Sequence, residues 1–79
     1  MRSFSHLHSS VVLRPAAPTD GVVVDRLARL DSARRLLGPV TLAELDGVPV
    51  AALERRTGRV VADPFVLTAR VQELLRLAG

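Results

Sequence analysis

Apolar residues recur along this chain with two different periods, and turn residues separate the segments. Val23, Leu27 and Leu30 stand at i, i+4 and i+7, which is the spacing of one face of a helix. They predict a helix from about Asp20 to Leu37, with a candidate interruption near Asp31-Ser32. Gly38 and Pro39 are expected to end this helix, Gly38 as a left-handed cap and Pro39 because it cannot continue a helix.

Short apolar segments bounded by turn residues predict strands. The predicted strands cover residues 11–15, 40–45, 48–54 and 59–62. Asp46-Gly47 predicts a type I′ hairpin between the second and third strands, since both central residues of that turn need positive φ. A second helix is expected from Ala69 to Leu77, with Thr68 as its cap.

Both faces of the predicted sheet are apolar. Alternate strand positions place Val40, Leu42, Val48, Val50, Ala52 and Val61 on one face. They place Ala43, Leu45, Ala51, Leu53, Val60 and Ala62 on the other. A sheet that is apolar on both sides needs a covering layer on each. The order β-α-β-β-β-α therefore predicts an α+β fold: a mainly antiparallel four-stranded sheet with one helix on each face. Residues 11–79 are expected to form this single domain, and residues 1–10, MRSFSHLHSS, a disordered leader.

Composition narrows the classes of function. The 79 residues suffice for one domain. The absence of Cys excludes disulfides, thiolate zinc sites and a cysteine nucleophile. No Trp, no Tyr and two Phe argue against a surface on which bases stack. The sequence has no apolar run near the ~18 residues of a membrane span and no signal peptide, so the cytoplasm is the expected location. The net charge is +3, and all eleven basic residues are Arg.

Three segments, in this order, resemble the first half of the GNAT-type N-acetyltransferases. LRPAAPTD is similar to their opening strand and the turn into the first helix, and VTLAELDGVPVAAL to their second and third strands. GRVVADPF is similar to the fourth strand, whose end normally holds the acetyl donor. The resemblance covers about Val11 to Leu77, which is half of such an enzyme. LDSAR, AELDG and RVVADPF also resemble segments of small, truncated actinobacterial GNAT-like proteins.

The sequence departs from that family at the coenzyme site. After the fourth strand these enzymes place a loop of the type R/Q-x-x-G-x-G/A, whose backbone N–H groups hold the pyrophosphate of coenzyme A. Here the corresponding stretch, PFVLTAR at 64–70, has no glycine, and the chain has no Tyr to serve as the general acid. The strands that complete the acyl cleft are also missing. We therefore expect no catalytic residue and no bound cofactor; acetyl-CoA would bind only if a partner chain supplied the missing half.

Two kinds of side chain could form a binding site. His6 and His8 share one side of an extended segment and could touch a metal together, although an incidental tail explains them more simply. Arg34-Arg35 and Arg55-Arg56 could contact phosphates. Each pair stands beside a turn, where solvated charge is ordinary.

Three acidic residues are candidates for acid–base chemistry. Glu44 and Glu54 lie on strands of the same sheet, in the region where such enzymes keep a general base. A role at an exposed sheet edge is the simpler explanation. Asp63, before Pro64, could face a ligand, or it could accept backbone hydrogen bonds at the strand end.

The leading hypothesis is a non-catalytic interaction domain. Without the second half of the parent fold, the strand Arg59–Ala62 keeps an unpaired edge, and such edges invite another strand. A homodimer or a protein partner along 59–62 is therefore expected. A second interpretation keeps acyl-CoA binding or N-acetyltransferase activity, which would need a partner chain. A third treats TLAELDGVPVAALERR as a helix-turn-helix that binds DNA through Val48 to Arg56, although a nucleic acid is not the expected partner. The secondary structure of Val40 to Leu53 separates the third interpretation from the predicted sheet.

Overall fold

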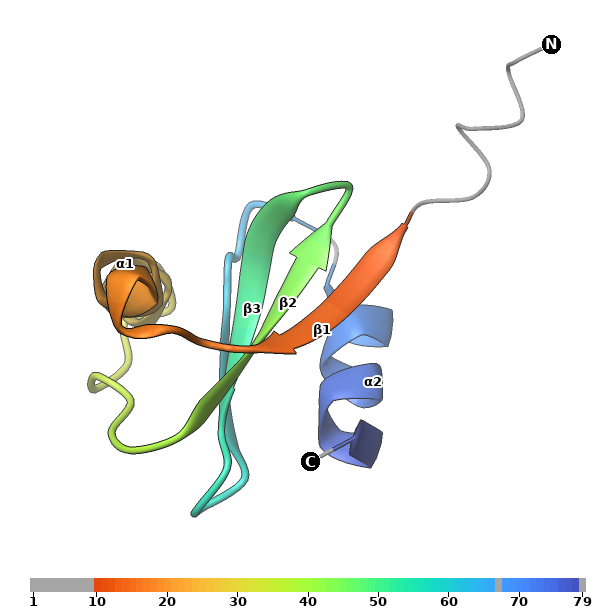
Figure 1. Ribbon diagram of the computed structural model, residues 1–79. Coiled ribbons are helices and arrows are strands. Elements are labelled where there is room, and N and C mark those ends of the chain that lie inside the picture. The colour runs from red at the N-terminus through yellow and green to blue at the C-terminus, as the bar shows by residue number, and fades with distance from the viewer. Residues whose placement is uncertain (1–9, 67, 79) are drawn as a thin grey trace, which may run out of the picture.

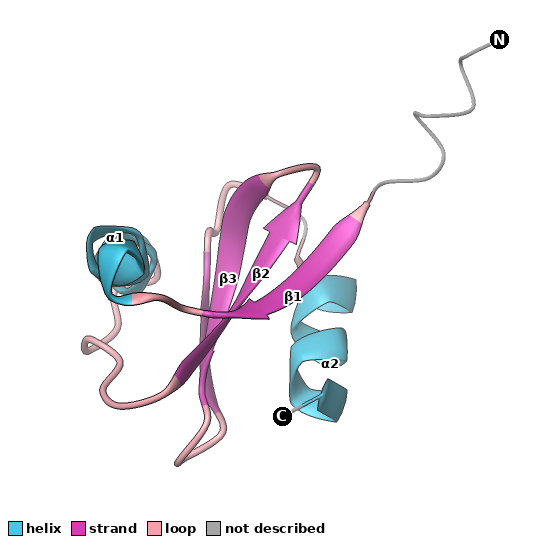
Figure 2. Ribbon diagram, in the orientation of Figure 1, coloured by secondary structure: helices cyan, strands magenta, loops and turns pink. Residues whose placement is uncertain are grey.

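The fold is built on one antiparallel sheet with a helix on each face (Figure 1). The computed structural model describes residues 10–66 and 68–78. Its elements are β1 (Val11–Pro15), a 3-10 helix η2 (Pro18–Asp20), α1 (Gly21–Leu30), β2 (Val40–Leu45), β3 (Val48–Glu54), β4 (Arg59–Ala62) and α2 (Ala69–Ala78). The strands lie in the order β1-β2-β3-β4, each antiparallel to its neighbours. The predicted α+β fold is confirmed, and Figure 2 shows the two helices on opposite sides of the sheet.

The segment over which two interpretations competed is a β-hairpin. β2 and β3 pair along their length, and the turn residues Asp46 and Gly47 have φ values of 52° and 84°. Both values are left-handed, as a type I′ turn requires. The helix-turn-helix interpretation is wrong, because Val48 to Glu54 is a strand and offers no recognition helix. Its apolar residues serve both faces of the sheet, which a single helical stripe could not do.

Two apolar clusters fill the space between the sheet and its helices. The cluster under α1 comprises Val24, Leu27, Ala28, Leu36, Val40, Leu42, Ala52 and Val61. The cluster under α2 comprises Ala43, Val50, Ala51, Leu53, Ala62, Val71 and Leu75. Because α2 contacts chiefly the central strands β2 and β3, residues of the outer strands on that face, such as Leu13 and Val60, are only partly buried.

A β-bulge changes the face that two valines occupy. The register between β2 and β3 shifts after Ala43, so that Val50 is an extra residue in β3. Val50 packs beside Ala51 in the cluster under α2, and Val48 beyond it also faces that side. The prediction that Val48 and Val50 share the face of Leu42 is wrong, because a bulge breaks the two-residue period of a strand.

The first helix ends at its predicted interruption. Ser32 adopts a φ of 52°, and its N–H donates to the carbonyl of Arg29 at 3.0 Å. The N–H of Ala33 donates to the carbonyl of Ala28 at 2.8 Å. These two hydrogen bonds form a Schellman motif, which closes the helix. The prediction that the helix runs to Leu37 is wrong, because the left-handed residue turns the chain away from the helix axis.

The sheet begins one residue before β1. Ser10, assigned above to the leader, donates its N–H to Asp46 Oδ1 and accepts the N–H of Asp46, both at 2.8 Å. His6 and His8 lie outside the described residues. Of the helices in the part of the chain that the structure describes, none is long and apolar enough to cross a membrane.

Candidate functional site

The outer edge of β4 is bridged by the segment that follows α1. β4 is the last strand of the sheet, as predicted. The backbone N–H of Ala62 points away from β3 and donates to Asp31 Oδ2 at 3.1 Å. The side chain of Arg59 donates to the carbonyls of Arg34 and Arg35, both at 2.9 Å. On the predicted docking strand, one outward backbone donor, the N–H of Ala62, is therefore already bonded, and the Arg59 side chain ties the strand to the segment after α1.

The outer edge of β1 is more open. The N–H of Ala16 donates to the carbonyl of Val40 in β2. Because backbone N–H groups alternate in direction along a strand, those of Val12 and Arg14 also point toward β2. Those of Val11 and Leu13 point outward, and no residue of 10–66 or 68–78 bonds them. The backbone nitrogen of Pro15 also faces this outer edge. Because proline has no N–H, its position there costs the sheet no hydrogen bond to β2. β1 thus offers two complete backbone donor and acceptor pairs.

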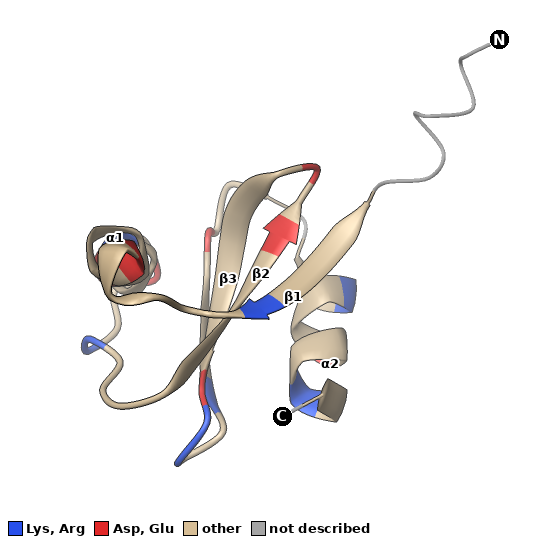
Figure 3. Ribbon diagram, viewed as in Figure 1, with Lys and Arg blue, Asp and Glu red and all other residues tan. Residues whose placement is uncertain are grey.

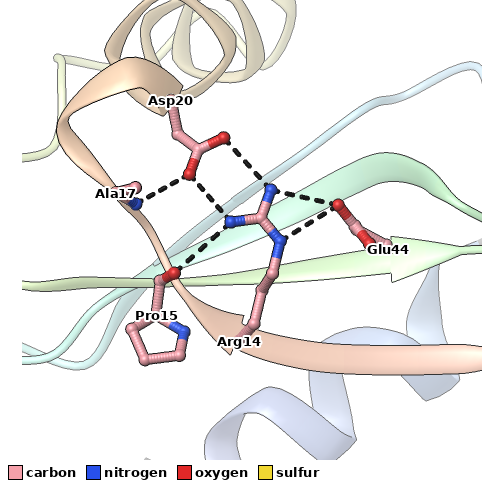
Figure 4. Close-up of polar contacts among 5 residues, drawn as sticks. All are labelled: Arg14, Pro15, Ala17, Asp20 and Glu44. Atoms are coloured by element: carbon pink, nitrogen blue, oxygen red, sulfur yellow. Dashed lines mark hydrogen bonds and ion pairs between the residues drawn. The ribbon is translucent and has the colours of Figure 1, made fainter.

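Glu44, a candidate general base, is held in an ion-pair network (Figure 4). Arg14 of β1 donates through Nε to Glu44 Oε2 at 3.1 Å. Its Nη1 and Nη2 donate to the carboxylate of Asp20 at 2.8 and 3.1 Å. Asp20 also accepts the N–H of Ala17 at 2.7 Å. The two carboxylates therefore attach the turn between β1 and α1 to the sheet.

The hydrogen bonds of this network shift the pKa values of Asp20 and Arg14 so that their charged forms are favoured. The hydrogen bond from Arg14, and then that from the N–H of Ala17, lowers the pKa of Asp20 from 3.8 to about 2. The hydrogen bonds to Asp20 and Glu44 raise the pKa of Arg14 above its ordinary value. A general acid or base works best with a pKa near the operating pH. The shifts move Asp20 and Arg14 away from that range, so the network is structural.

Glu54, the second candidate base, is also used to hold loops together. It is 6% exposed, and its carboxylate accepts the Thr57 hydroxyl and, at 2.6 Å, the N–H of Leu37. Arg59 lies 3.8 Å away. The bond from Thr57, followed by that from Leu37, lowers the pKa of Glu54. Glu44 and Glu54 stand near opposite ends of the β2-β3 hairpin, so the structure does not bring them together as a catalytic pair. The predicted role at an exposed sheet edge is wrong, because β2 and β3 are the inner strands and neither side chain is exposed.

Asp63 accepts backbone hydrogen bonds at the strand end, which is the simpler of its two predicted roles. Its side chain accepts the N–H of Phe65 at 2.8 Å, and its carbonyl accepts the N–H of Val66 at 3.3 Å. These are two of the N–H groups that a pyrophosphate at the end of β4 would need. The loop therefore lacks both the glycines and these two free donors.

The two arginine pairs, 20 positions apart in sequence, lie at the same end of the molecule. Arg59 holds the carbonyls of the first pair, and the N–H of Arg55 donates to the carbonyl of Pro39 at 3.0 Å. Figure 3 shows basic residues on the segment after α1 and at the turn between β3 and β4. We call this set the arginine cluster: Arg34, Arg35, Arg55, Arg56 and Arg59.

A shallow cavity of about 330 Å³ lies between the β1-α1 turn and the segment 35–40. Its lining is about as polar as it is apolar, and its charged groups are Asp25 and Arg35, which pair at 3.6 Å. Within residues 10–66 and 68–78, no three His, Asp or Glu side chains gather in a way that could hold a metal ion.

Sequence reasoning missed the contacts of Asp20 and Asp31, and those that Arg14 and Arg59 make with acidic side chains and loop carbonyls. Arg14 and Glu44 are 30 positions apart, and Asp31 and Ala62 are 31 apart. No local pattern marks such contacts. Comparisons with protein-family models, with curated proteins and with solved structures each found no match.

Proposed function

We propose that this chain is a non-catalytic interaction domain, derived from an acetyltransferase fold, that binds a protein partner by pairing a strand with an edge of its sheet. The element order agrees with what the resemblance to the first half of that family implies. The candidate acids at positions 44 and 54 are used in structural contacts, which supports a role without catalysis.

The proposal rests on one observation: the backbone N–H and C=O groups of Val11 and Leu13 point away from β2, at the outer edge of the sheet. An added strand gains affinity from main-chain hydrogen bonds and specificity from alternate side chains. Val12, between them, is 46% exposed and presents an apolar contact on the α1 side. We favour β1 over the strand 59–62, because Asp31 already accepts the outward N–H of Ala62 in β4. The expected location remains the cytoplasm.

The cysteine-free chain allows a direct test. Purified variants with single cysteines at Val12, Val60 and Val22 would each be labelled with a thiol-reactive photo-crosslinker and added to cell extract, Val22 being the control on α1 at 77% exposure. A partner is expected to crosslink from Val12 and not from Val22. The purified partner should then slow amide exchange at Val11 and Leu13. Protection at Val60 instead would move the site to β4, and no edge-dependent partner at either strand would contradict the proposal.

A further inference from the structure

The arginine cluster carries an excess of positive charge. The chain has eleven arginines and eight acidic residues. The five members of the cluster have two acidic side chains in ion-pair contact, Asp25 with Arg35 and Glu54 with Arg59. The five guanidinium groups therefore exceed their paired carboxylates by three charges.

The backbone under the cluster is fixed by buried and bridging contacts. Two loops carry most of the cluster: residues 31–39, between α1 and β2, and residues 55–58, between β3 and β4. Glu54 accepts a hydrogen bond from Leu37 of the first loop and one from Thr57 of the second, so it connects the two loops. Arg59 adds two bonds to the first loop. Arg34, Arg55 and Arg56 are exposed, and the side chain of Arg35 is 72% exposed. Several guanidinium groups thus stand in water on a scaffold that is already ordered.

The ligand that suits this surface is a chain of phosphates. Exposed arginines gain little from single carboxylates in water. A nucleic acid has closely spaced charges, and its bound counterions are released when guanidinium groups replace them. The residues that dominate binding in protein interfaces are mostly Trp, Tyr and Arg held in well-packed, water-free pockets. Among the described residues of the two loops, Leu37 is the only large apolar side chain that is exposed.

We propose that the arginine cluster binds the phosphate backbone of a nucleic acid without reading its base sequence. The described residues of the cluster's two loops include no aromatic side chain on which a base could stack and no Asn or Gln to read a base edge. This surface is separate from the β1 edge, so the inference does not depend on the proposed function.

The test measures fluorescence anisotropy of a labelled mixed-sequence duplex with the full chain over a range of salt. If three or four of the exposed arginines each contact one phosphate, the slope of log K against log salt is about −2.7 to −3.6. Affinity should then fall roughly 40- to 150-fold between about 50 and 200 mM salt. Single-stranded DNA and RNA probes of the same sequence show which nucleic acid binds most tightly.

Two double variants of equal net charge separate a site from general attraction. R55Q/R56Q should make the slope shallower by about 2. R70Q/R76Q removes two exposed arginines of α2 and should leave the slope unchanged. Circular dichroism checks that both variants fold. Equal effects of the two variants, or no binding at low salt, would overturn the proposal.

Two competitors test the chemical class of the ligand. Unlabelled duplex should displace the probe far better than polyglutamate at the same charge concentration. If polyglutamate competes equally well, the surface binds acidic protein segments and the nucleic-acid assignment is wrong. If inorganic pyrophosphate competes equally well at the same phosphate concentration, the site takes a single phosphate group and a polymer is not required.

Discussion

The carboxylate of Asp31, the residue that follows α1, accepts a hydrogen bond from the backbone N–H of Ala62 in β4 at 3.1 Å. One residue thereby joins the end of the first helix to the last strand of the sheet. An unpaired edge strand is a template for unwanted pairing, and covering it with a loop is one protection that proteins use. This contact makes β1, rather than β4, the more available edge.

Replacing Asp31 should open the edge of β4. In Asp31→Ala the N–H of Ala62 loses its acceptor, so amide exchange at Ala62 should accelerate and the free energy of unfolding should fall by about 1–2 kcal/mol. Hydrogen exchange by NMR and urea unfolding measure the two effects. Asp25→Ala is the control, since Asp25 pairs with Arg35 at 3.6 Å on the surface and should change stability little. Equal losses in both variants would show that the bond to Ala62 is unimportant.

Stability should depend on pH through Asp20. Its pKa falls from 3.8 to about 2 on folding, so the unfolded chain binds a proton more readily than the folded one. The contribution is therefore fully present above pH 3.8 and is lost as the pH falls toward 2. Urea unfolding midpoints across this range should decline in the wild type and decline less steeply in Asp20→Asn. Identical profiles would mean that Arg14 does not stabilise the charged form of Asp20.

Two glycines should respond in opposite ways to the same substitution. Gly47 has a φ of 84°, so Gly47→Ala should destabilise the hairpin by about 1–2 kcal/mol even though the added Cβ meets no atom within 4 Å. Gly21 has helical angles, φ −54° and ψ −42°, and open space around it. Gly21→Ala should therefore stabilise by about 0.4–1 kcal/mol, because it restricts the unfolded chain. Thermal unfolding of both variants checks the signs, and a stabilised Gly47→Ala would contradict the type I′ turn.

Local chemistry decided which elements could be predicted. The hairpin at Asp46-Gly47 was predictable because both turn residues tolerate positive φ and short apolar segments flank them. The end of α1 was harder, since the left-handed position is occupied by Ser32 rather than by glycine. The bulge at Val50 has no marker in the sequence, and neither do contacts such as Arg14 with Glu44, which depend on the assembled sheet. The arginine cluster was visible only as two unrelated pairs.

The packing of α2 should depend on a single leucine. Leu75 is fully buried against the sheet, and Leu77, two residues later, is 80% exposed. Leu75→Ala should cost about 2–5 kcal/mol through lost burial and the cavity that it leaves. Leu77→Ala is the matched control on the same helix and should stay within about 0.5 kcal/mol. Similar losses for both variants would contradict the orientation of this helix.

Acetyl-CoA should not bind at the end of β4. The N–H groups of Phe65 and Val66 are bonded to Asp63, and the loop has no glycine to permit close approach of a pyrophosphate. An NMR titration should leave the resonances of residues 59–70 unchanged. Saturable shifts confined to that segment would restore coenzyme binding as a working function.

The long connection between β1 and β2 has a consequence for the order of folding. β2, β3 and β4 follow one another through short turns, whereas Arg14 and Glu44, which join β1 to β2, are 30 positions apart. Contacts between distant positions require closure of a larger loop and form more slowly. We expect the three-stranded meander to form first and β1 to dock last. The strand that offers the open edge is then also the strand whose docking completes the sheet, so a nascent chain would present that edge only after the rest of the sheet had formed.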